Sequence, residues 1–80
     1  MNLYLISQDE VDGYDTYSDA VVAANTVEEA ATLHPNGQRI PAATECGTWT
    51  NDPNNVTVNL IGTAMVGTEV GVICASFHAG

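Results

Sequence analysis

Ten carboxylates and one arginine, Arg39, dominate the ionisable side chains of this 80-residue chain, which contains no lysine. Half of the carboxylates fall between residues 9 and 19, here called the acidic segment: Asp9, Glu10, Asp12, Asp15 and Asp19. Oxygen ligands gathered in this way could bind a hard cation such as Ca²⁺, or could face a basic protein surface. The formal net charge of −9 costs a small folded domain some self-repulsion, so we expect the acidic segment to have a role outside folding.

The acidic segment does not match a calcium-binding loop. An EF-hand places its ligands at alternating positions and ends on a bidentate glutamate, whereas this segment has neither the spacing nor that glutamate. We therefore expect no metal and no cofactor. Two interpretations stay open: a solvated loop, or a protein-binding surface on which carboxylates imitate phosphates in a groove lined by arginine and lysine.

Two tyrosines, Tyr14 and Tyr17, flank Asp15 and Thr16 in the same segment. Tyrosine is enriched among the residues that anchor protein interfaces, so both are candidate contacts for a partner. The alternative is that both rings only cover the edge of a sheet. The candidate partner-binding set is therefore Asp9, Glu10, Asp12, Asp15, Asp19, Tyr14 and Tyr17.

No motif in the chain predicts catalysis. Cys46 and Cys74 lack a CxxC partner, and we expect free thiols, with Cys74 buried as a small core residue. His34 is expected to cap carbonyl groups at the end of a helix. Catalysis needs a nucleophile within hydrogen-bond reach of a base, and no such arrangement is visible in the sequence. We therefore expect a protein that is not an enzyme.

The charge also excludes classes of partner. Direct nucleic-acid binding requires several lysine or arginine side chains that displace counterions from phosphates, and one arginine cannot supply them. An anionic membrane surface is excluded for the same reason. A sponge for a nucleotide signal stays open as an alternative, but several copies would then have to assemble their Arg39 side chains in one pocket.

The elements that must position these residues can be read from local patterns. Strands are expected at 2–8, 20–24, 56–61 and 70–77, with residues 9–17 as a turn or loop. Thr26-Val27-Glu28-Glu29 is a capping box that begins a short helix ending near His34. This predicts an α+β fold of order β-β-α-β-β, in which one helix covers one face of a four-stranded, mainly antiparallel sheet.

Burial patterns add three expectations to this single domain, residues 1–80. The nearly continuous apolar run 70–77 indicates a central strand covered on both sides, and Val56, Val58 and Leu60 are expected to face inward. Trp49 is expected to cap the open end of a small core.

A short chain buries little surface alone, so a homodimer is a further expectation. The N-terminus has no basic residue before its short apolar run, which favours a soluble, cytoplasmic protein.

Several stretches resemble a family of small proteins encoded by phages and prophages. The resemblance is carried by Gly13-Tyr14-Asp15-Thr16-Tyr17, Asp19–Ala24, Thr48-Trp49, Ile61-Gly62-Thr63-Ala64 and the ending Gly71–Gly80. The family usually ends Ala-Ser-Phe-Asn-Ala-Gly, and here His78 replaces the asparagine. The resemblance implies a phage accessory protein, a class that includes inhibitors of host defence such as anti-CRISPR proteins.

Together, charge and resemblance favour one hypothesis. The chain is expected to be an acidic inhibitor that binds a basic, nucleic-acid-facing surface of a host defence protein. The nucleotide sponge is one alternative. The other is a structural protein whose acids meet only water.

Overall fold

A computed structural model gives the structure of the chain for residues 1–9, 16–40 and 48–78. These residues form four strands, one α-helix and one 3-10 helix. In chain order the elements are β1 (Asn2–Ser7), β2 (Thr16–Ala24), α1 (Val27–Ala31), η1 (Pro53–Asn55), β3 (Thr57–Thr63) and β4 (Gly71–His78).

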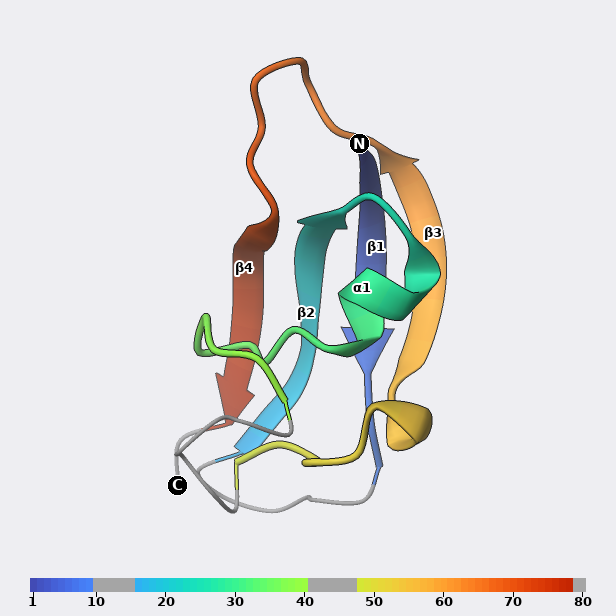
Figure 1. Ribbon diagram of the computed structural model, residues 1–80. Coiled ribbons are helices and arrows are strands. Elements are labelled where there is room, and N and C mark those ends of the chain that lie inside the picture. Colours follow the sequence, from blue (N-terminus) through green and yellow to red (C-terminus); the bar gives the residue numbers. More distant parts are fainter. Residues whose placement is uncertain (10–15, 41–47, 79–80) are drawn as a thin grey trace.

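The four strands form one sheet in the order β3-β1-β2-β4, and every neighbouring pair is antiparallel. Helix α1 lies over one face of this sheet (Figure 1). The predicted α+β fold, a small antiparallel sheet with one short helix, is therefore confirmed. Because β1 and β2 are the inner strands, the connection from β3 to β4 crosses from one edge of the sheet to the other.

Strand β2 begins earlier than the sequence predicted. The prediction of a loop through Tyr17 is wrong, since β2 starts at Thr16 and pairs with β4 from Thr16↔His78 onward. The backbone N–H of Tyr17 also donates to the carbonyl of Thr48 at 2.8 Å. These non-local hydrogen bonds extend the strand, and they place Asp19 inside it instead of at its start.

Helix α1 begins as the capping box predicted and ends sooner. Thr26 Oγ1 accepts a hydrogen bond from the backbone N–H of Glu29 at 3.1 Å, and Glu29 Oε1 accepts one from the backbone N–H of Asn25 at 2.8 Å. The expected continuation to His34 is wrong. Leu33 instead forms an isolated bridge with Arg39, a pairing that draws the chain out of the helix.

The buried side chains collect on the helix side of the sheet, here called the covered face. Alternate residues of a strand point to opposite faces, and Tyr4, Ile6, Ala20 and Val22 all point toward α1 and the loops that follow it. Trp49 is only 3% exposed and belongs to the same cluster, so its predicted role in closing the core is confirmed. The remaining members of the cluster are Ala24, Ala30, Leu33 and Ile40.

Three predictions about the later strands are wrong. Strand β4 is an edge strand that pairs only with β2, and its Cys74 is exposed instead of buried. Val56, just before β3, and Val58 within it pack against the core as expected, but Leu60 is 64% exposed. The pattern of apolar residues in these strands does not reveal that each lies at an edge of the sheet, beyond most of the covering layer.

Candidate partner-binding surface

Polar side chains form a row across all four strands near one end of the sheet. Ser7 pairs with Asp19 on β2 and with Thr57 on β3, and Asp19 pairs with Ser76 on β4. Paired residues share a face of the sheet, and this row lies on the face opposite the core, here called the open face. The row marks the end of the sheet at which β1 finishes and β3 begins.

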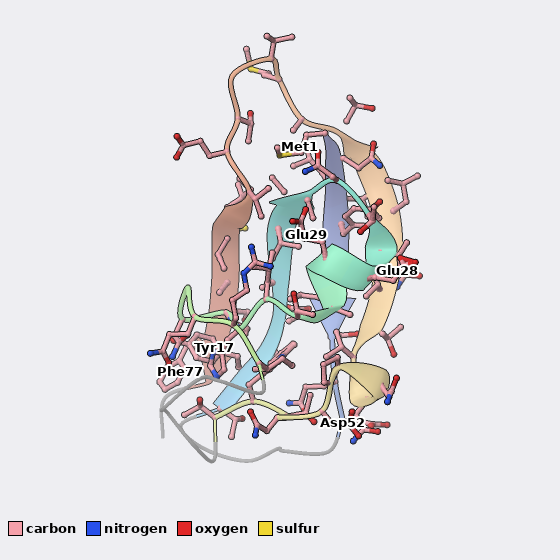
Figure 2. The ribbon with its side chains drawn as sticks, in the orientation of Figure 1. Met1, Tyr17, Glu28, Glu29, Asp52 and Phe77 are labelled. Atoms are coloured by element: carbon pink, nitrogen blue, oxygen red, sulfur yellow. The ribbon has the colours of Figure 1, made fainter. Side chains whose placement is uncertain are left out.

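Three carboxylates gather at this end, here called the acidic end: Asp9, Asp19 and Asp52. Asp9 follows the last residue of β1 by two positions, and Asp52 directly precedes η1, which leads into β3. Figure 2 shows Asp52 beside η1 at this end of the molecule. Asp9 and Asp52 are exposed, whereas Asp19 is half-buried within β2.

The acidic end is not neutralised from within the described part of the chain. The only arginine, Arg39, donates from Nη1 to Thr32 Oγ1 at 3.1 Å instead of to a carboxylate. Asp52 has a local role, because its Oδ1 accepts the backbone N–H of Asn54 at 3.0 Å and caps η1. That hydrogen bond leaves its negative charge without a cation, so the carboxylates at this end face solvent or a partner.

The remaining described acids lie elsewhere. Glu28 and Glu29 are on α1 over the covered face, where Figure 2 labels both. Glu69 is exposed in the connection between β3 and β4, at the opposite end of the sheet from Asp52. The structure thus brings Asp9 and Asp19, which the sequence singled out, to the same end as Asp52, which it did not. The predicted site residues Glu10, Asp12, Tyr14 and Asp15 lie outside the described residues.

The Tyr17 side chain is half-buried, and its ring contacts other aromatic rings instead of projecting freely into solvent. Its ring makes edge contacts with Phe77, at a centroid distance of 4.8 Å, and with His34, at 5.8 Å. Figure 2 shows Tyr17 and Phe77 together near the end of β4. Phe77 is 45% exposed and was missed by the sequence reasoning. The pair forms an aromatic border close to the acidic end, and either ring can contribute to an interface there.

His34 does not cap the helix as predicted. It is 1% exposed, and its Nδ1 accepts the backbone N–H of Asn36 at 3.0 Å. Accepting this bond requires a lone pair on Nδ1, so the ring is held as the neutral tautomer with its proton on Nε2, facing Thr48 Oγ1 at 3.4 Å. The histidine therefore ties the turn after α1 to the segment that carries Trp49.

Trp49 buries a polar group at a cost. Its indole Nε1–H has no hydrogen-bond partner among the described residues, and an unmade buried hydrogen bond costs about 1–3 kcal/mol.

The described residues also contain no group of three or more histidine, cysteine or acidic side chains arranged to hold a metal ion. What the acidic end offers a partner is charge beside the aromatic surface of Tyr17 and Phe77.

Comparison with known proteins adds no relative. No family model, no curated protein and no solved structure matches the chain. Among the described helices none is long and apolar enough to cross a membrane. The function must therefore be argued from the acidic end and the sheet that carries it.

Proposed function

We propose that this protein is a non-enzymatic, phage-type accessory protein that inhibits a host defence protein by occupying its basic, nucleic-acid-facing surface. One observation carries the proposal. The chain has ten carboxylates and one arginine, so lysine and arginine leave an excess of nine negative charges. Several of the carboxylates gather at one end of a rigid sheet.

Position matters as much as the number of charges. Asp19 is held by a strand that pairs on both sides, with Ser7 and Ser76 as its cross-strand neighbours. Asp52 is held by the 3-10 turn that it caps. Carboxylates fixed in this way need little ordering when they meet guanidinium groups, which lowers the entropic cost of binding. Their shared potential also speeds association with a basic surface.

The sequence offers a matched pair of variants to test this proposal. The ten acids divide into five in the acidic segment and five outside it: Glu28, Glu29, Glu45, Asp52 and Glu69. Converting either set to the corresponding amides gives a net charge of −4, since five of nine excess negative charges are removed. Amide oxygens still accept hydrogen bonds, so the caps made by Glu29 and Asp52 are retained in the second variant.

The measurement is competition for a short poly-arginine peptide, followed by displacement of DNA from nucleic-acid-binding defence proteins. We expect the acidic-segment variant to bind about tenfold or more weakly than the parent. The other variant changes only Asp52 among the described carboxylates of the acidic end, so its affinity should fall much less. Binding of the parent should weaken as salt rises, because exposed charge pairs are screened. Equal losses in both variants would mean that only total charge matters, and an acidic-segment variant that inhibits as well as the parent would refute the proposal.

A further inference from the structure

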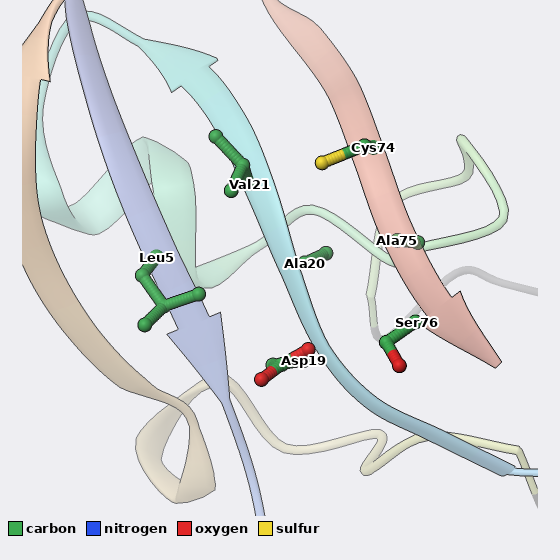
Figure 3. A pocket seen from close by; sticks show the side chains of 7 residues that line it. All are labelled: Leu5, Asp19, Ala20, Val21, Cys74, Ala75 and Ser76. Atoms are coloured by element: carbon green, nitrogen blue, oxygen red, sulfur yellow. The ribbon is translucent and has the colours of Figure 1, made fainter. Parts of the chain in front are cut away.

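The open face of the sheet is apolar at its centre. The register places Leu5, Val21 and Cys74 in one cross-strand row, which ends at Asn59 on β3. Leu3 and Ala23 lie in the next row. Figure 3 shows the side chains of Leu5, Val21 and Cys74 on this face, with α1 behind the sheet. They border a shallow depression of about 160 Å³ that also reaches Asp19 and Ser76.

The described residues supply the main covering layer to one face, although Ala23 on the open face is also fully buried. Helix α1 and the buried loop residues Leu33, Ile40 and Trp49 all pack into the single cluster on the covered face. An antiparallel sheet with one face in water normally alternates apolar and polar residues. Strand β1 does not alternate, because Leu3-Tyr4-Leu5-Ile6 is apolar on both faces. The inner strands thus have the composition of a sheet with two covered faces.

Charge indicates what covers the second face. Along the paired rows of the open face, Asp19 is the sole charged residue, although the chain carries ten carboxylates. A basic partner has little to recognise in the central rows of this face, away from Asp19. Two copies of this chain, by contrast, repel one another through their carboxylates. When they approach through the central rows of the open face, the fewest like charges are brought together.

We propose that the open face packs against the open face of a second copy, so that two sheets form a sandwich with the helices outside. Asp19 also selects the orientation. A two-fold axis parallel to the strands would bring the two Asp19 side chains to the same end. A two-fold axis that lies between the sheets and runs perpendicular to the strands places the two Asp19 side chains on opposite sides of the axis. If the axis passes over the Val21 row, the two side chains are separated by about 13 Å along the strand direction.

This orientation places β4 over β4 and Cys74 near its own copy. The contact is small: four strands about 4.8 Å apart and seven residues of about 3.3 Å give a face of roughly 450 Å². A standard interface buries about 800 Å² on each partner. The dimer is therefore weak and populated at high protein concentration, and its contact shares Asp19 with the acidic end.

Thiol cross-linking tests both the surface and the orientation. In a Cys46→Ser background, Cys74 is the only thiol. Sheets packed face to face lie about 10 Å apart, whereas a disulfide needs Cα atoms within about 6.8 Å. A bis-maleimide of matching span should therefore link two copies through Cys74, and mild oxidation should link them poorly. Efficient disulfide formation would instead indicate edge-to-edge pairing of β4 and would overturn the proposal.

A control variant with the same number of thiols measures the background of cross-linking between copies that meet at random. Glu28 is exposed on α1, on the opposite side of the sheet, so the variant Cys46→Ser, Cys74→Ser, Glu28→Cys should link at most one tenth as efficiently. Cys74→Asp should weaken self-association about tenfold or more without loss of folding, since Cys74 is exposed on an edge strand. Equal linking from Glu28→Cys, or a protein that stays monomeric at millimolar concentration, would contradict the proposal.

Discussion

The two faces of this sheet are built from the same strands yet meet different surroundings. On the covered face, Ile6 and Val22 are fully buried beneath α1 and the segment around Trp49. On the open face, Leu5 and Val21 come from the same strands and are only half-buried. The comparison teaches that apolar composition alone does not say which face of a small sheet is covered by its own chain. The main layer is supplied by α1 and by the loop residues Leu33, Ile40 and Trp49, which all pack on one face.

The largest expected effect lies at the covered face. Trp49→Ala should lower the free energy of unfolding by about 3–5 kcal/mol, as truncation of a large buried aromatic does. Trp49→Phe should cost far less, because it removes the unpaired Nε1–H together with its penalty of about 1–3 kcal/mol. Urea unfolding of both variants checks the difference. Equal losses would contradict this expectation, because they would mean that a phenyl ring fills the site no better than a methyl group.

Two neighbours on β1 compare the faces directly. Ile6→Ala should destabilise by about 2–5 kcal/mol, because it leaves a cavity in a closed core. Leu5→Ala should cost about 1 kcal/mol, since its site is open and water can fill the space. Both are measured by chemical denaturation at low protein concentration, where a weak dimer is absent. An equal cost at both positions would mean that the open face is covered within a single chain.

The covering helix itself depends on its cap. Thr26→Ala should cost about 1 kcal/mol through loss of the hydrogen bond from the backbone N–H of Glu29. Thr26→Ser keeps an oxygen in the same place and should change stability by no more than about a few tenths of a kcal/mol. Thermal unfolding followed by far-ultraviolet circular dichroism distinguishes the two. A neutral Thr26→Ala variant would show that packing of Ala30 alone holds the helix.

The smallest effect is expected from charge. Either five-acid amide variant should change the free energy of unfolding by about 0.5 kcal/mol or less, toward greater stability at low salt, because self-repulsion falls. The gain should vanish as salt rises and screens the remaining charges. A loss of several kcal/mol in either variant would mean that the carboxylates hold the fold together instead of serving an outside partner.

Local features of the fold could be predicted from sequence, and non-local ones could not. The cap at Thr26 was predictable because every group in it lies within four residues. The early end of α1 was not, because it depends on the pairing of Leu33 with Arg39 across a turn. The run 70–77 looked like a central strand, since an apolar strand at an edge has the same composition as one in the middle.

In the candidate site, too, the local part could be predicted from the sequence and the non-local part could not. The acidic segment was visible as a cluster in the sequence, but Asp52 joins it only through the pairing of β1 with β3. An Asp-Pro pair just before an expected strand was the available signal, since it favours a turn at the strand's start. Phe77 was hidden in a run that looked buried, and its exposure follows from the edge position of β4.

Self-association as a function of salt tests the account of the open face most directly. Two copies that each carry −9 repel one another at long range, and salt screens that repulsion while strengthening apolar contact. Sedimentation equilibrium at about 0.05 M and about 0.5 M salt, over which the Debye length falls several-fold, should show dimerisation becoming tighter. Dimerisation that weakens with salt, or a monomer at both concentrations, would contradict the account.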